Sequence, residues 1–252
     1  MAKLKTHVYI DGFNLYKRAL EESPYKWLDL GHLCSLVLSN YDIRKIYYFT
    51  ARIKPTPHDP NQALRQQIYF RALRVNPLVE IIESSFVANT PNMPVYPWEY
   101  ESEGEPKKVK VIHFKEKGSD VNIATQMLID AYTNQCEAQF VLTADSDLVR
   151  PITHLKNVGK TVGLILPTTK ASKKIMAAAS PLIHHVRTSA LAASQYPETL
   201  IDSVGEFSKP NRWEKTETPT EVGVSRPATE ATGDVGSLYH FPTLLKVFEI
   251  TV

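Results

Sequence analysis

The chain has 252 residues, of which 43% are hydrophobic and 22% are charged, and its formal net charge is +2. This length and composition are typical of one sizeable globular domain with a tail. No apolar run approaches the roughly 18 residues that a transmembrane helix needs, and the N-terminal apolar stretch is too short for a signal peptide. We therefore expect a cytoplasmic protein without a membrane partner. Cys34 and Cys136 belong to no CxxC or His/Cys group, which argues against a zinc site and a structural disulfide.

The charge is unevenly distributed along the chain. Residues 1–197 contain 24 Lys and Arg against 18 Asp and Glu, a net charge of +6, whereas the remainder contains 5 against 9, a net charge of −4. A basic body of this kind suits a polyanionic partner. An ordinary solvated surface accounts for the imbalance equally well.

Short apolar, β-branched segments alternate with segments of helical periodicity along the first 190 residues. The predicted strands are 6–11, 44–50, 79–86, 139–144, 161–167 and, as a sixth, 181–187. The predicted helices are 28–40, 60–75, 119–134 and 147–159. Several strands are continuously apolar, as strands buried on both faces are. The alternation therefore predicts an α/β domain with a mainly parallel sheet.

Two segments fall outside this alternation. Residues 88–106 contain four prolines and no periodicity, which predicts a long loop or flap inserted in a domain that spans residues 1–190. Residues 191–252 are predicted to form a largely disordered, acidic, low-complexity tail. The tail ends in the apolar segment 238–250, which we expect either to dock as a short helix or to bind a partner, a second copy of the chain or another protein.

Four aspartates lie at the ends of these elements. Asp11 ends the first strand, Asp145 and Asp147 follow the strand 139–144, and Asp120 begins the helix 119–134. Ligands of open parallel sheets bind beyond the carboxyl ends of the strands, so the four acids are expected to converge there. Two carboxylates about 4 Å apart repel by about 4 kcal/mol at an effective dielectric near 20. A hard divalent cation such as Mg²⁺ or Mn²⁺ would relieve this repulsion.

Each acid also has a simpler structural interpretation. Asp147 and Asp120 each precede or begin a helix and are possible N-caps. Asp11 stands before Gly12 and suits a turn. Asp145 has no comparable structural role in the sequence, and independent coincidences at all four positions are much less expected than one.

Further polar residues accompany the acids. Asn14 lies one turn into the helix after the first strand, where its amide can position a carboxylate, a water or a phosphate oxygen. Thr143 at the strand end can hydrogen-bond an acid or a phosphate. The basic residues near the flap are expected to contact phosphates, or else to be ordinary solvated side chains; these are Lys110, Lys115 and Lys117. The flap aromatics are expected to stack unpaired bases or, more often in such loops, to pack on their own domain; these are Tyr96, Trp98 and Tyr100.

Three stretches of the sequence resemble the NYN domain family, the LabA-like branch of the PIN-type nucleases. They are "YIDGFNLY" (9–16), "KGSDVNIATQMLIDAY" (117–132) and "FVLTADSDLVRPITHLKNVGKTVGLI" (140–165). The family pattern is D-x-x-N, then K-G-x-D, then D-S-D, and the matching residues here are Asp11 with Asn14, Lys117 and Gly118 with Asp120, and Asp145 with Asp147. The chain departs from the family where Thr143-Ala144 replace Ser-Gly and Leu148 replaces Phe, and neither change removes an acid.

The resemblance covers about residues 5–188 and implies a three-layer α/β/α, PIN-like (Rossmannoid) fold. It also implies a Mg²⁺- or Mn²⁺-dependent ribonuclease that cleaves single-stranded RNA, we expect endonucleolytically. The catalytic and metal-binding residues would be Asp11, Asp120, Asp145 and Asp147. Two alternatives stay open: a catalytically weak module of the same fold that binds RNA or protein for regulation, and a phosphatase for small phosphate esters. Retention of all four acids argues against the first, and the basic surface argues against the second.

Overall fold

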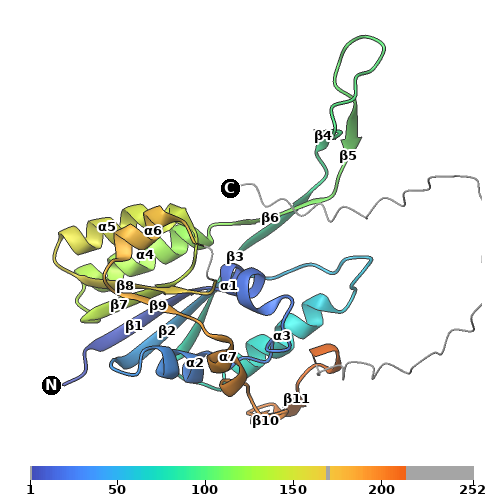
Figure 1. Ribbon diagram of the computed structural model, residues 1–252. Coiled ribbons are helices and arrows are strands. Elements are labelled where there is room, and N and C mark those ends of the chain that lie inside the picture. Colours follow the sequence, from blue (N-terminus) through green and yellow to red (C-terminus); the bar gives the residue numbers. More distant parts are fainter. Residues whose placement is uncertain (1, 169–170, 214–252) are drawn as a thin grey trace, which may run out of the picture. The chain divides into compact units, whose positions relative to one another are not determined.

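The computed structural model of the chain describes residues 2–168 and 171–213 and contains one large sheet with helices on both faces (Figure 1). The spatial order of the strands is β6 (His113–Lys117), β3 (Val79–Asn89), β2 (Asp42–Ala51), β1 (Lys5–Asp11), β7 (Ala138–Leu142), β8 (Thr161–Leu166) and β9 (Ile183–His185). Neighbouring strands run parallel except for the edge strand β6, which is antiparallel to β3. The predicted mainly parallel sheet is therefore confirmed, and it includes all six predicted strands.

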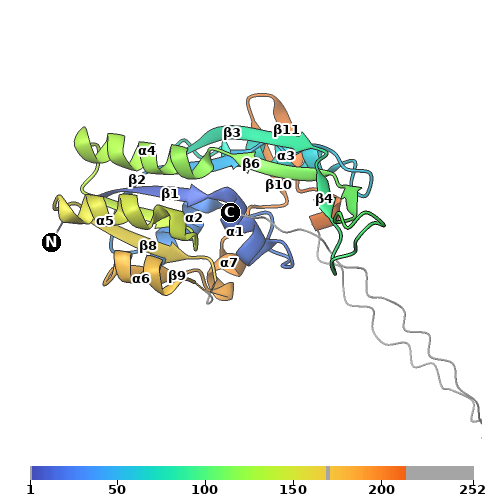
Figure 2. The ribbon, with the colours of Figure 1, turned by 90° about the horizontal axis from the view of Figure 1, so that it is seen from above.

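Two layers of helices cover the sheet. The helices α2 (Leu30–Val37), α3 (Gln62–Leu73) and α7 (Thr188–Ala193) pack in one apolar core, and α4 (Ser119–Tyr132), α5 (Val149–Asn157) and α6 (Lys173–Ala179) pack in the other. Figure 2 shows α4, α5 and α6 side by side on their face of the sheet. The predicted three-layer α/β/α arrangement is confirmed. Among the described helices, none is both long and apolar enough to cross a membrane.

The central strand β1 shows how the sequence produces the two cores. Val8 and Ile10 belong to the core under α2 and α3, whereas Tyr9, between them, belongs to the core under α4 and α5. Successive side chains of a strand point to opposite faces, so a strand between two helical layers has to be apolar at every position. The burial of the whole "VYI" segment follows from this requirement.

The order of the strands reverses beside β1. From β1 the chain continues outward through β2 and β3 on one side, and after α4 it returns to β7 on the other side of β1. Such a reversal opens a crevice at the carboxyl ends of the two diverging strands, where open α/β sheets bind their ligands. The carboxyl ends of β1 and β7 are therefore the expected location of a functional site.

The described chain continues in ordered elements beyond residue 190, at which the sequence places the domain boundary. Strands β10 (Thr199–Asp202) and β11 (Gly205–Ser208) form a separate antiparallel hairpin. Phe207 and Trp213 lie against the buried Trp27, each with ring centroids 6.4 Å from it. Scattered apolar residues within a polar stretch thus extend the core beneath α2 and α3. The apolar segment 238–250 lies outside the described residues.

Residues 88–106 form paired strands with the residues that follow them, which the prolines conceal in the sequence. Strand β3 continues to Asn89, and β4 (Asn92–Pro94) then pairs with β5 (Lys108–Lys110) in a two-stranded sheet of its own. Beyond it, the Val95 N–H donates to the Lys107 carbonyl at 3.0 Å. In Figure 1 this hairpin continues β3 and β6 away from the helices. The predicted loop is therefore a hairpin arm.

A buried polar network joins β1 to α4 at the end of β1 remote from Asp11. The Asp130 carboxylate contacts the His7 Nδ1 at 2.7 Å, accepts from the Tyr9 hydroxyl at 2.7 Å and accepts from the Gln126 Nε2 at 2.9 Å. Burial alone would lower the pKa of His7, but hydrogen bonds to Asp130 and Cys136 raise it to about 9. The network therefore contains an ion pair near neutral pH, and each hydrogen-bonded donor has an acceptor.

Candidate carboxylate site

Asp11 is the last residue of β1 and lies at the carboxyl edge of the sheet, where β1 pairs with β7. The residue is only 6% exposed. One carboxylate oxygen accepts from the Asn14 N–H at 2.9 Å, which makes Asp11 the N-cap of the short helix α1 (Gly12–Leu15), and the other accepts from the Thr143 hydroxyl at 3.1 Å. Asp11 thus joins the carboxyl ends of two neighbouring strands that are far apart in the sequence.

Asn14 and Thr143 fix the loop that follows β7. The Asn14 Oδ1 accepts from the Ala144 N–H at 3.0 Å, and the Thr143 Oγ1 accepts from the Asp145 N–H at 3.1 Å. Together with the Thr143–Asp11 bond, these contacts hold Asp145 at a defined position beside Asp11. The structure therefore brings together Asp11, Asn14 and Thr143 as the sequence predicts.

Asp145 and Asp147 lie in the segment that follows β7. The Asp145 Oδ1 accepts from the Asp147 N–H at 3.0 Å, so Asp145 is the N-cap of the 3₁₀ turn Ser146–Leu148 that leads into α5. The sequence prediction for these two residues is wrong, because it offers Asp147 as a possible N-cap and gives Asp145 no structural role. The extra 3₁₀ turn moves the cap two residues upstream. Asp147 itself is exposed.

Asp120 lies in the first turn of α4 and does not cap it. The cap position is Gly118, whose φ of 104° is a left-handed conformation that favours glycine. The cap function is performed by Glu116, whose carboxylate accepts from the Ser119 N–H at 2.9 Å and from the Ser84 hydroxyl at 2.5 Å. The structural interpretation of Asp120 as a cap is therefore wrong, which leaves its carboxylate available for another role.

Electrostatic repulsion connects these acids. Burial raises the pKa of Asp11 to about 7, helped by the charges of Asp120 and Asp145 and opposed by the hydrogen bonds from Asn14 and Thr143. Burial also raises the pKa of Asp120 to about 6, together with the charges of Asp145, Glu116 and Asp147. All four predicted acids therefore interact at one edge of the sheet. Each of the two shifts indicates a site in which an additional negative charge is unfavourable.

Glu116 is an acid of this edge that sequence reasoning missed. It lies on β6, just before the turn at Gly118, and its charge is one of the causes that raise the pKa of Asp120. The only available signal was its position in "KEKGSD", where alternation places it on the face opposite to Lys115 and Lys117.

The acids interact by charge without yet forming a coordination sphere. Within the part of the chain that the structure describes, no group of three or more His, Cys, Asp or Glu side chains is arranged to hold a metal ion. The carboxylate oxygens of Asp11 and Asp145 instead accept the backbone and hydroxyl hydrogen bonds described above. The donor set is nevertheless all oxygen and multiply charged, which is the chemistry that Mg²⁺ and Mn²⁺ prefer.

The three predicted phosphate-binding lysines do not contact the acids. Phe86 of β3 and Phe114 of β6 stack in a row with Phe13 of α1, so their face of the β3–β6 ribbon is the one beside Asp11. Strand alternation places Lys115 and Lys117 on the opposite, exposed face. Lys110 lies farther away, on β5 of the arm.

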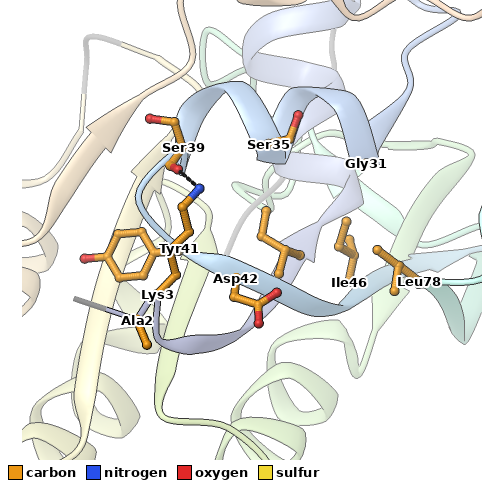
Figure 3. A pocket seen from close by; sticks show the side chains of 10 residues that line it. Ala2, Lys3, Gly31, Ser35, Ser39, Tyr41, Asp42, Ile46 and Leu78 are labelled. Atoms are coloured by element: carbon orange, nitrogen blue, oxygen red, sulfur yellow. Dashed lines mark hydrogen bonds between the residues drawn. The ribbon is translucent and has the colours of Figure 1, made fainter.

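A shallow pocket lies at the opposite edge of the sheet. Figure 3 shows residues of α2 and β2, and of the segments that precede β1, β2 and β3, around it, with Lys3 donating to the Ser39 carbonyl at 2.6 Å. Its acid, Asp42, is paired with Arg44 at 2.6 Å. This pocket contains none of the predicted site residues and lacks their mutual repulsion.

Replacement of Asn14 by Ala is expected to lower the free energy of unfolding by about 1–3 kcal/mol. The change leaves the partly buried Ala144 N–H without its acceptor. Asn14→Asp is the matched variant, because it keeps an acceptor oxygen, and its loss should be smaller at pH 5 than at pH 8, where the added charge faces Asp11. Urea unfolding of both variants measures the difference. A loss for Asn14→Asp at pH 5 that equals the loss for Asn14→Ala would contradict the assigned contact.

Comparison with known proteins gives three findings. The model of the NYN domain family matches residues 5–186. The chain is 28% identical over 236 residues to 6-hydroxy-3-succinoylpyridine 3-monooxygenase HspA of Pseudomonas putida, covering 83% of this chain and 75% of that one. It is also similar to the crystal structure of a protein of unknown function from Vibrio parahaemolyticus, with a TM-score of 0.46 and 13% identity, covering 74% of this chain and 94% of that one.

Proposed function

Because the chain belongs to the NYN domain family, a PIN-like group of the nuclease superfamily, we propose that it is a metal-dependent endoribonuclease acting on single-stranded RNA. The observation that carries the proposal is the state of Asp11. This acid is buried at the point where the strand order reverses, and burial and the charges of Asp120 and Asp145 raise its pKa to about 7. A protein that used these acids only as helix caps would gain nothing from their mutual repulsion.

The residues fit a divalent cation in their chemistry. The cation would be held by Asp11, Asp120, Asp145 and Asp147. All four supply carboxylate oxygens, and each carboxylate is close enough to another to repel it. When bound, the cation supplies Lewis-acid activation of water and charge neutralisation of the phosphodiester. It would also relieve the repulsion that now favours a proton on Asp11.

The chain's own residues orient the acids and hold the substrate. Asn14 and Thr143 fix Asp11 and the Asp145 loop, so the two strand ends keep a constant separation. In this proposal RNA phosphates away from the cleaved bond contact the exposed lysines of β6, Lys115 and Lys117, because these lysines lie on the face opposite to the acids. The net charge of +6 over residues 1–197 favours the approach of a polyanion.

One test compares three substrates in the presence of Mn²⁺ or Mg²⁺: labelled single-stranded RNA, DNA of the same sequence and a phosphomonoester. We expect internal cleavage of the RNA, loss of cleavage in EDTA and recovery when the metal is returned in excess. Asp145→Asn should inactivate the protein, whereas Asp42→Asn, which removes a partly exposed acid paired with Arg44, should not. RNA cleavage that persists in EDTA or in Asp145→Asn would refute the assigned site.

A regulatory module that binds RNA without cleaving it is the second candidate. It is favoured by one observation, that the described acids hold hydrogen bonds of the fold and do not form a ready coordination sphere. In the same assay this module would retard RNA in a gel without producing fragments, with or without metal.

The name of the Pseudomonas putida relative describes an oxygenase, so 6-hydroxy-3-succinoylpyridine with dioxygen and a reductant is a further substrate to include.

A further inference from the structure

The end and the base of the hairpin arm differ in charge and in the kind of apolar side chain that they expose. The arm consists of β4, β5 and the loop 95–107 that joins them, and it forms a sheet separate from the main one (Figure 1). We call residues 96–105 the tip, and β4 and β5 together with residues 111–112, which follow β5, the stem. A two-stranded hairpin by itself is marginally stable in water. Its exposed side chains therefore indicate what could cover it.

The tip combines exposed aromatic rings with negative charge. Tyr96, Trp98 and Tyr100 are 88%, 59% and 63% exposed, so these rings do not pack on their own domain. The tip also contains four glutamates and no Lys or Arg, namely Glu99, Glu101, Glu103 and Glu105. Only Glu99 has an ion pair within the described residues, with Lys107 at 2.7 Å. Three large exposed rings in one loop are typical of a protein contact surface.

The stem has the complementary character. Its exposed apolar side chains are aliphatic, with Met93 at 41%, Val109 at 44% and Ile112 at 65%. Met93 and Val109 are cross-strand partners and so form one small apolar surface. Lys108 and Lys110 point to the other face of the stem by strand alternation, and neither has an ion pair within the described part of the chain. The stem contains no acidic residue.

We propose that the arm is a dimerisation element that binds the arm of a second copy of this chain in antiparallel orientation. The acidic, aromatic tip of one arm would then cover the basic, aliphatic stem of the other, and the reverse contact follows from two-fold symmetry. Each contact places rings against methyl and thioether groups on one face of the paired arms, and the free glutamates beside the free lysines on the other face. The charge of the tip opposes the alternative, in which the rings stack on RNA bases, because four glutamates repel phosphates. The inference does not rest on ribonuclease activity.

Charge reversal tests the pairing of tip with stem. One variant changes Glu101, Glu103 and Glu105 to Lys, and the other changes Lys108 and Lys110 to Glu. Mass is measured by sedimentation velocity over a concentration series without RNA. The full-length wild type is expected to move from 28.5 kDa toward twice this mass as its concentration rises. Each variant alone brings like charges together in both contacts and should weaken dimerisation at least about 100-fold.

An equimolar mixture of the two variants gives the decisive result. The reversed tip of one variant then faces the reversed stem of the other, and the two unreversed halves also match, so a heterodimer should form about as readily as the wild-type dimer. Circular dichroism checks that each variant is folded. A wild type that stays monomeric throughout, or variants that do not recover on mixing, would overturn the proposal. Quenching of Trp98 fluorescence by an RNA oligonucleotide bound to a monomer would instead assign the tip to RNA.

Discussion

Asp11→Asn is expected to lower RNA cleavage at least about a thousandfold. The substitution keeps the size of the side chain and the hydrogen-bonding pattern of the protonated acid, but it removes the charge of a residue that the proposed function makes a metal ligand. Loss of several kcal/mol of transition-state stabilisation corresponds to such a factor. The measurement is the rate of fragment formation from single-stranded RNA at saturating Mn²⁺.

The same variant should be more stable than the wild type when metal is removed by EDTA. The pKa of Asp11 is raised to about 7 in the folded protein, so its protonated form favours folding, and this stability is lost as pH rises from about 4 through 7. The amide that replaces the carboxyl group never carries the charge. We therefore expect Asp11→Asn to raise the free energy of unfolding by about 2–4 kcal/mol at pH 8 and by almost nothing at pH 4.

This combination of lost activity and gained stability separates a functional acid from a structural one. Asp42→Asn serves as the control and should change neither quantity appreciably, because surface ion pairs contribute at most about 1 kcal/mol. An Asp11→Asn protein that is inactive and also less stable at pH 8 would show that Asp11 chiefly holds the fold.

Asp130→Asn is expected to lower the free energy of unfolding by about 3–5 kcal/mol at pH 6. The carboxylate of Asp130 accepts from Tyr9 and Gln126 and is paired with His7, and the residue is only 2% exposed. An amide cannot satisfy every donor, and it leaves the His7 imidazolium without its counter-charge. Urea unfolding followed by circular dichroism measures the loss.

The pH dependence of this network provides its own check. The pKa of His7 is raised to about 9, so the stability from the pair is fully present below about pH 6.5 and is lost as pH rises through 9. Burial alone would raise the pKa of Asp130, but the hydrogen bonds from His7, Tyr9 and Gln126 lower it, so its contribution is lost only in acid. The cost of Asp130→Asn should therefore shrink toward pH 10. A cost that is the same at pH 6 and pH 10 would exclude the ion pair.

The architecture could be predicted because its strongest signals are local. Continuous apolar strands such as 6–11 and 139–144 identify a sheet covered on both faces, and the helical spacing of 119–134 identifies α4. The hairpin arm could not be predicted in the same way, because Pro91, Pro94 and Pro97 interrupt any strand pattern. The elements after residue 190 were missed because they are stabilised by distant contacts with Trp27.

The candidate site shows the same division between local and distant information. The sequence predicts that Asp11 and Asp145 lie close together, because Asp11 ends one strand and Asp145 follows another. The pairing of β1 with β7 brings these two strand ends together. The capping of the 3₁₀ turn by Asp145 and of α4 by Glu116 depends on backbone geometry that the residue types do not specify. Lys115 and Lys117 point to the exposed face because of the way β6 pairs with β3. This pairing joins segments about 30 residues apart in the sequence.

The hydrogen bond between Thr143 and Asp11 spans 132 positions of the chain. A ribosome synthesises the two halves of the acidic cluster at different times, and the second half follows only after α4 and β7. A nascent polypeptide that stops before residue 145 therefore lacks two of the four aspartates, however well its first strands have folded. If the cluster cleaves RNA, the messenger being translated is exposed to the completed site only once most of the domain has left the exit tunnel.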